Sequence, residues 1–341
     1  MNVEFLDTET ATEPQLQALY DLVVAEHEEL WNEDPVEPYE VWRKQVTTPA
    51  SWVKPLRWVA ADGAGRLLGV AFLGVGLTET NRDKAGLATY VRPEARRQGI
   101  AKAVLRPAVE RALEEGRVLL NGGGITDADA STFSEALGAE RKITERKSRM
   151  VLADVDRSML EDWVVKAKQR AEGYSMLAWD GPVPDEYLEK FVALTMVMNT
   201  APRDDLEMDD WIHTPERHRE GEQRSIERGT TWWTLVVRHD ATDELVGYTE
   251  LYFPRHVTDG AWQEATAVDP THRDKGIGRW LKATNCLRLF TDKPEVQYVD
   301  TWNAFSNAPM LGINIAMGFE VIKSFSEYQI RTEALAERLG A

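Results

Sequence analysis

The chain has 341 residues, 43% of them hydrophobic and 28% charged, a composition typical of globular proteins long enough for two domains. Its 40 basic and 57 acidic residues give a net charge of −17, which repels nucleic acids and anionic lipids and favours the approach of cationic small molecules. No run of eighteen apolar residues occurs, so we expect no membrane-spanning helix. Because of the negative charge, we expect neither membrane nor nucleic acid as a partner.

The chain has one cysteine, Cys286, which excludes an intramolecular disulfide and fits a reducing cytoplasm. We interpret it as a packed thiol rather than a nucleophile. The first residues lack a basic stretch followed by an apolar one, so no secretory signal is expected. His213 and His218 have no cysteine or further histidine beside them, so no metal site is expected.

Hydrophobic periodicity predicts the elements of the first half. In chain order they are a helix over 14–30, a hairpin of strands 57–61 and 67–75, a strand over 87–91, a helix over 102–115 with a break or kink near Pro107, a strand over 117–121, a helix over 131–137 and a strand over 147–152. A helix over 159–171 follows. We expect a first domain over 1–153, a connecting segment over 154–173 and a second domain over 174–341.

The second half repeats this order. The predicted elements are a strand over 174–179, a helix over 185–198, a helix over 215–228, a hairpin of 231–238 and 245–252, a strand over 264–268, a helix over 278–290 and a strand over 296–302. The acidic segment 199–213 has two interpretations: it walls a substrate pocket and receives an amine, or it is a solvated loop.

The stretch from Val268 to Lys282 places a basic loop with two glycines between a strand and a helix. Glycines allow close backbone approach, and the amides of a helix N-terminus attract anions. The spacing is neither Gly-x-x-x-x-Gly-Lys-Ser/Thr nor Gly-x-Gly-x-x-Gly. The loop therefore predicts a phosphate or pyrophosphate site of another type.

A second copy of this loop lies earlier in the chain. Val91, Pro93, Arg96, Gly99 and Ile100 match, at a constant offset of 177 positions, Val268, Pro270, Arg273, Gly276 and Ile277. Ala101 stands opposite Gly278. Five identities at one offset indicate a duplicated domain.

Both copies resemble the Arg/Gln-x-x-Gly-x-Gly/Ala signature of GNAT-superfamily acyltransferases. The segment from Asn303 to Asn307, followed by Gly318-Phe319, resembles the family's segment after its fifth strand. The resemblance implies a mixed α/β chain of two tandem GNAT folds, each a mostly antiparallel twisted sheet flanked by helices. It also implies acetyl-CoA as cosubstrate and no metal. The implied donor-binding residues are Thr266, Ala267, Val268, Arg273, Asp274, Lys275, Gly276, Ile277, Gly278, Arg279, Asn303 and Asn307, with Arg96, Gly99 and Ala101 in the first copy.

Direct acetyl transfer to an amine needs a base. We place it at Glu264, which strand alternation puts on the face of Thr266, with Glu250 in reserve; a surface or ion-paired glutamate is the alternative for both. Family members often carry a tyrosine acid where this chain has Asn314. Tyr328 is a possible replacement, or else a core residue.

The two copies are unequal, because Gly123 and Asp127 stand opposite Asn303 and Asn307. We therefore expect catalysis in the C-terminal unit, on a small-molecule amine, and a degenerate N-terminal unit. The alternatives are a non-catalytic CoA-binding or sensing protein, a mycothiol-synthase-like enzyme, an acetyltransferase for antibiotic amines, and a protein N-acetyltransferase.

Overall fold

The computed structural model describes residues 2–126 and 129–341, so Asp127 lies outside the described residues. The chain forms two compact units. Unit 1 contains residues 1–144, 204–209 and 325–341, and unit 2 contains residues 145–203 and 210–324. These bounds differ from the predicted ones, because unit 1 includes the last seventeen residues of the chain and unit 2 includes the helix predicted as a connection.

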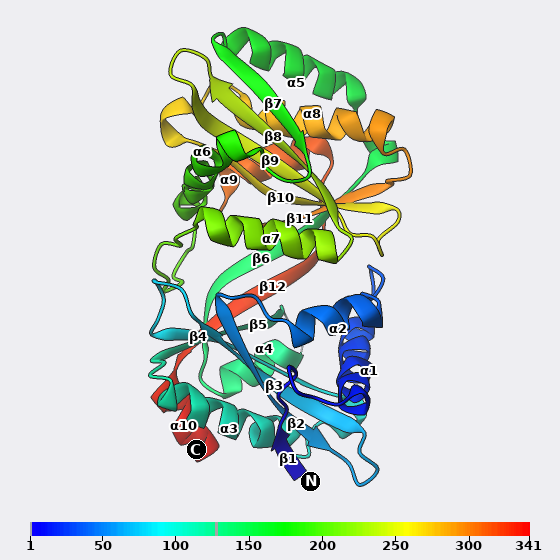
Figure 1. Ribbon diagram of the computed structural model, residues 1–341, viewed down its shortest axis with the longest axis vertical. Coiled ribbons are helices and arrows are strands. Elements are labelled where there is room, and N and C mark those ends of the chain that lie inside the picture. The colour runs from blue at the N-terminus through cyan, green and yellow to red at the C-terminus, as the bar shows by residue number, and fades with distance from the viewer. Residues whose placement is uncertain (1, 127–128) are drawn as a thin grey trace. The chain divides into compact units, whose positions relative to one another are not determined.

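Unit 1 is built from elements of the first half and one helix from the C-terminus. They are β1 (Asn2–Phe5), α1 (Glu13–Leu30), α2 (Tyr39–Thr47), β2 (Val53–Ala61), β3 (Leu67–Gly76), β4 (Lys84–Val91), η1 (Pro93–Ala95), α3 (Ile100–Glu114), β5 (Leu119–Ile125), α4 (Asp129–Ala136) and α10 (Thr332–Leu339) (Figure 1). The sequence did not predict β1, α2 or α10, and α3 runs through Pro107 without interruption.

Unit 2 repeats the arrangement. Its elements are α5 (Arg157–Arg170), β7 (Tyr174–Asp180), α6 (Asp185–Thr195), η3 (Met196–Thr200), α7 (Pro215–Glu227), β8 (Thr231–His239), β9 (Glu244–Phe253), β10 (Gly260–Val268), η4 (Pro270–His272), α8 (Ile277–Asp292), β11 (Tyr298–Ala304) and α9 (Ala308–Met317). Among the described residues, no helix is long and apolar enough to cross a membrane.

Each unit closes its sheet with a strand from the other half of the chain. The last part of β12 (Glu320–Arg331) pairs with β5, so the order in unit 1 is β1-β2-β3-β4-β5-β12. The last part of β6 (Glu140–Val151) pairs with β11, so the order in unit 2 is β7-β8-β9-β10-β11-β6. Within the described parts of the two units, the β4–β5 and β10–β11 ladders are parallel and the other ladders are antiparallel. The mixed α/β class with mostly antiparallel sheets is confirmed.

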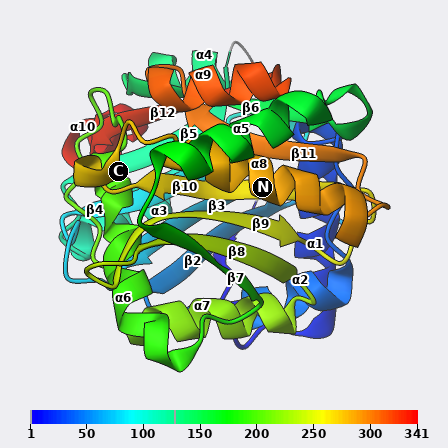
Figure 2. The same ribbon diagram turned by 90° about the horizontal axis from the view of Figure 1, so that it is seen from above.

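Helices cover both faces of the unit 2 sheet. Side chains alternate along β8, so Leu235 and Val237 pack towards α5 and α8, while Val236 packs towards α6. Figure 2 shows β8 and β9 between α5 and α8 on one side and α6 and α7 on the other. Because both faces are covered, β8 is buried along almost its whole length.

The parallel pair in each unit separates part-way along. In unit 2 the β10–β11 ladder covers Gly260 to Gln263 and stops there, although β10 continues to Val268. In unit 1 the β4–β5 ladder covers only Lys84 to Gly86. Beyond Gln263, β10 has no ladder to β11, so the backbone groups of β10 on that side are not used by this pairing.

Candidate active site

The two basic loops share their backbone conformation as well as their sequence. Gly99 and Gly276 both have φ +80° and sit at the N-caps of α3 and α8. Two residues earlier, Arg97 and Asp274 also have positive φ, +63° and +65°. A left-handed φ favours glycine, and the first amides of each helix have no intrahelical acceptor. Each loop therefore presents backbone donors at the positive end of a helix.

Arg273 is held against the unit 2 loop by two hydrogen bonds. Its Nε donates to the carbonyl of Val268 over 3.0 Å, and its Nη2 donates to Thr200 Oγ1 over 3.0 Å. Among the residues that the structure describes, no carboxylate forms an ion pair with Arg273, although its charge helps to lower the pKa of Asp269. Its charge is thus available to an anion at the N-terminus of α8, and the loop fits a pyrophosphate.

Two strand glycines that the sequence analysis did not single out allow the helices to approach the sheets. A Cβ on Gly247 of β9 would lie 3.1 Å from Cγ2 of Ile277. A Cβ on Gly69 of β3 would lie 2.9 Å from Cγ2 of Ile100. The isoleucines are the matched first residues of α8 and α3, so each glycine sets how deeply the loop sits. An isolated glycine inside a predicted strand was the available signal.

A β-bulge in β10 lies where β10 leaves β11. Gln263 faces Leu251 and Thr266 faces Thr249, so Glu264 and Ala265 together oppose Glu250. The side chain of Gln263 holds the bulge, since its Nε2 donates to Thr249 Oγ1 over 2.9 Å and to the Glu250 carbonyl over 2.8 Å. The expected alternation is therefore wrong here. The extra residue puts Thr266 on the face of Thr249, where their hydroxyls are 2.7 Å apart.

Glu250 and Glu264 lie close enough to interact. Burial raises the pKa of Glu250 to about 8, with further contributions from the charges of Glu264 and Glu222. Glu264 reaches solvent, yet the protein packed around it raises its pKa too. Burial, followed by the charges of Glu250, Glu264 and Glu222, raises the pKa of Tyr252 well above its usual value. No cationic partner of Glu250 or Glu264 is found among the described residues. The site has proton-accepting groups that a cation could neutralise.

A third carboxylate, Glu222 of α7, borders this pair. Burial alone would raise its pKa, but hydrogen bonds from His218, the Val183 amide and Arg219 outweigh burial and lower it. The Val183 amide lies 2.7 Å away, and Arg219 Nη1 lies 2.5 Å away. His213, 3.1 Å from His218, has its pKa lowered to about 4 by burial, His218 and Arg217. Glu222 is therefore a fixed negative charge beside the other two.

The comparisons with known proteins agree with this geometry. The model of the acetyltransferase (GNAT) family matches residues 16–125 and 198–303, which is more than half of the chain and includes both loops. The chain belongs to the GNAT acetyltransferase family. It is accordingly an enzyme of acyl transfer, and its two units are tandem GNAT units.

Solved structures resemble this chain over nearly its whole length. A tandem GNAT protein from the clavulanic acid biosynthesis pathway has a TM-score of 0.77 and 23% identity, covering 97% of this chain and 99% of its own. A GCN5-related N-acetyltransferase from Sphaerobacter thermophilus has a TM-score of 0.65 and 14% identity, covering 97% and 96%. At such identities the likeness concerns the fold. No curated protein matches the sequence.

The asparagines of this GNAT chain lie on β11 and α9. Asn314 Nδ2 donates to Asn303 Oδ1 over 2.6 Å, and Asn307 caps α9 by accepting from the Met310 amide. Asn314 is 2% exposed, and its Oδ1 has no partner in the described part of the chain. The amide at the position of the family's tyrosine is thus buried and fixed by Asn303.

Tyr328 lies in unit 1, on β12 opposite Gly122 of β5. It lines a cavity of about 120 Å³ where β4 and β5 separate, together with Leu87, Asn121 and Phe133. The ring is buried, at 3% exposure, and the hydroxyl points to Glu135 over 3.4 Å. Tyr328 is therefore a packed strand residue of unit 1, the second of its two expected roles.

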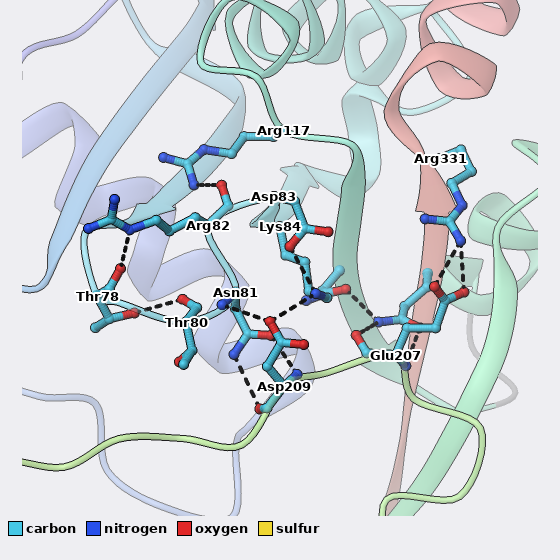
Figure 3. A network of polar contacts seen from close by, with 12 residues as sticks. Thr78, Thr80, Asn81, Arg82, Asp83, Lys84, Arg117, Glu207, Asp209 and Arg331 are labelled. Carbon is cyan, nitrogen blue, oxygen red and sulfur yellow. Dashed lines mark hydrogen bonds and ion pairs between the residues drawn. The ribbon is translucent and has the colours of Figure 1, made fainter.

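Part of the acidic segment between η3 and α7 belongs to unit 1. The amide of Asn81 donates to Asp209 Oδ2 over 3.1 Å, and Lys84 Nζ lies 3.5 Å from the same oxygen. Glu207 pairs with Arg331 at 2.8 Å (Figure 3). These carboxylates are about half exposed and already pair with cations of unit 1, so they do not form a free acidic wall.

The predicted donor-binding residues occupy four places in the GNAT units. Thr266, Ala267 and Val268 end β10; Arg273, Asp274, Lys275, Gly276, Ile277, Gly278 and Arg279 form the loop and first turn of α8; Asn303 and Asn307 follow along β11 and the start of α9; Arg96, Gly99 and Ala101 lie in unit 1. Arg279 stacks over Trp163 with its guanidinium carbon 5.0 Å from the ring centre.

Cys286 is buried on α8 at 3% exposure, and burial raises the pKa of its thiol to about 12. It is therefore protonated and unreactive at neutral pH. Within the described residues, no group of three or more histidine, cysteine or acidic side chains is arranged to hold a metal ion.

Proposed function

We propose that unit 2 transfers an acetyl group from acetyl-CoA directly to a small-molecule amine. The observation that carries this proposal is the pair Glu250 and Glu264, placed by the bulge of β10 where that strand leaves β11. The raised pKa of Glu250 and the lack of a cationic partner suit a protonated amine that must lose a proton before it attacks.

We propose that the α8 loop binds the donor. Arg273 and the free amides at Gly276 to Gly278 are the groups for the pyrophosphate. Asn303, oriented by Asn314, is the group for the pantetheine arm. Asn307 already accepts a bond from Met310, which makes its predicted contact with the donor weaker. Acetyl-CoA supplies an activated acyl group with a thiol leaving group.

The chemistry of the transfer follows from the charges present. A lysine-like amine has a pKa of about 10.4, so at pH 7 it is almost entirely protonated. Glu250, with a pKa of about 8, is a closer match to that amine than an ordinary glutamate, and its ionised fraction, which grows as the pH rises from 7 to 9, accepts the proton. Amides of Ala265 to Val268 that face β11 are free to stabilise the developing negative charge on the carbonyl oxygen.

The test is release of CoA thiol when the protein is mixed with acetyl-CoA and a panel of amines. Glu250→Gln and Glu264→Gln should each lower kcat/KM by about 10²–10⁴, because they remove a general base or its neighbour. Glu244→Gln is the matched control, since Glu244 is exposed on the same strand. CoA binding without turnover of any amine would sink the enzymatic proposal and favour a CoA sensor. Turnover of a protein N-terminus, or of a cysteine-linked pseudodisaccharide amine, would favour the protein-acetyltransferase or mycothiol-synthase-like alternative.

We further propose that unit 1 is structural or shapes the substrate site, and that the reaction takes place in the cytoplasm. The ion pairs that Asp209 and Glu207 form within unit 1 support the first proposal. The single buried thiol supports the second.

A further inference from the structure

The two units hold the same arginine in the same way at their loops. In unit 1, Arg96 Nε donates to the Val91 carbonyl over 3.1 Å. In unit 2, Arg273 Nε donates to the Val268 carbonyl over 3.0 Å. Both carbonyls lie five residues before their arginine, and both arginines lie three residues before the left-handed glycine. The backbone of the two anion cradles is therefore equivalent.

The far end of the guanidinium meets different partners in the two units. Nη2 of Arg273 contacts a neutral hydroxyl, Thr200 Oγ1, at 3.0 Å. Nη2 of Arg96 contacts both carboxylate oxygens of Glu29, at 2.7 and 2.8 Å. This ion pair is more than two-thirds covered, with side-chain exposures of 29% and 28%. The partner on α1 has the charge and shape with which a phosphate would bind the arginine.

Other groups hold Glu29 in place. The hydroxyl of Tyr90 donates to Glu29 Oε2 over 3.0 Å, and Tyr90 is itself buried on β4 at 5% exposure. Glu26, one turn earlier on α1, lies near enough to feel the charge of Glu29, and its pKa is raised to about 7, mainly by burial. The unit 1 loop therefore faces a turn of α1 that brings carboxyl groups towards it, whereas η3 in unit 2 has none.

We propose that Glu29 closes the unit 1 loop to the pyrophosphate of CoA, so that the chain binds a single CoA, in unit 2. The carboxylate of Glu29 takes the position of a phosphate oxygen pair on Arg96, and its charge opposes any other anion there. Glu29 is thus the residue that decides which of the two equivalent cradles accepts the donor. This inference rests on the proposed function for the identity of the donor. The unit 1 cavity between β4 and β5 survives, but without an anion site it does not hold CoA.

The test is the number of CoA molecules bound per chain, measured by equilibrium dialysis against CoA. The wild-type chain should bind one. Glu29→Gln, and Glu29→Thr, which copies the hydroxyl partner of unit 2, should bind two, with the second site at least about tenfold tighter than any residual unit 1 binding in the wild type. Glu28→Gln removes the same charge from an exposed neighbour on α1 and should still bind one.

A variant background assigns the sites. Gly276→Glu places a carboxylate in the unit 2 cradle, where a Cβ meets nothing closer than 3.7 Å. Because a non-glycine residue is strained at φ +80°, its melting temperature is compared with that of the wild type. CoA binding should fall from one to none in Gly276→Glu alone and return to one in Gly276→Glu with Glu29→Gln. Two molecules bound by the wild type, or one by both Glu29 variants with unchanged melting temperatures, would overturn the inference. If both Glu29 variants bind one CoA, unit 2 still turns over, so this result rejects the role of Glu29 and leaves the proposed function standing. The proposed function fails instead if the wild type binds no CoA.

Discussion

Replacing Glu250 should make the protein less active and, at alkaline pH, more stable. Its pKa is raised from 4.5 to about 8 in the folded chain, so folding disfavours the ionised form. A raised pKa of this kind contributes stability that is complete below pH 4.5 and is lost as the pH rises through about 8. Each pH unit in that interval removes about 1.4 kcal/mol, so ionisation of Glu250 costs up to about 3 kcal/mol at pH 7 and about 5 kcal/mol at pH 9.

Glu250→Gln keeps the size of the side chain and removes the ionisation. The variant should gain up to about 4 kcal/mol relative to wild type when the pH is raised from 5 to 9. The assay is urea unfolding of both proteins at pH 5, 7 and 9, with Glu244→Gln as the exposed control from the same strand. A stability difference between Glu250→Gln and wild type that is the same at all three pH values would refute the burial of a carboxylate without a cationic partner. In parallel, kcat/KM of the wild type should rise about tenfold from pH 7 to about pH 9 as Glu250 ionises, and this rise should be absent in Glu250→Gln.

Three further predictions follow from the site and the sheet. Gly276→Glu should abolish turnover while Gly99→Glu leaves most of it, measured as thiol release; the reverse would move catalysis to unit 1. Gln263→Ala removes the amide that hydrogen-bonds the bulge to Thr249, so it should lower kcat by at least tenfold and lower the free energy of urea unfolding by about 1–3 kcal/mol. An unchanged kcat would show that the bulge keeps its geometry without the Gln263 side chain. Asp300→Asn should lower stability by about 3–5 kcal/mol, because buried Lys147 and half-buried Arg149 lose the carboxylate of Asp300; a neutral effect would mean that water solvates the two cations.

The basic loops could be predicted from the sequence because their determinants are local. A glycine at a left-handed φ, a proline that ends the strand and an arginine that bonds back to the strand all lie within ten residues. Because the loop sequence occurs twice at an offset of 177 positions, each copy supports the prediction made for the other. The positive φ at Arg97 and Asp274 shows that the repeat extends to the backbone where the side chains differ.

The carboxylate site could be predicted only in part, because a bulge changes the face of every residue after it. The sequence indicates Glu250 and Glu264 as candidates, but strict alternation places Glu264 without the extra residue that follows Gln263. Nothing in the local sequence marks that insertion, since Gln263 fixes it by bonds to Thr249 on the neighbouring strand. The contact between Glu29 and Arg96 was equally hidden, because 67 residues separate the two along the chain.

The exchange of strands gives a physical reason why a chain with one proposed active unit keeps both. Unit 2 includes the last part of β6, residues 145–151, which lies before α5 in the chain. This segment brings Lys147 and Arg149 to the buried carboxylate of Asp300 at 3.1 and 2.7 Å. Removing residues 1–153 would delete both cations, and an uncompensated buried carboxylate costs about 3–5 kcal/mol before the lost strand pairing is counted. Unit 1 in turn needs the C-terminal segment, because Leu335, Ala336 and Leu339 of α10 pack into the same cluster as α3. Unit 2 contains residues 145–151 and unit 1 contains residues 325–341, so a cut of the chain at residue 153 leaves both units incomplete whether or not the unit 1 loop ever binds a donor.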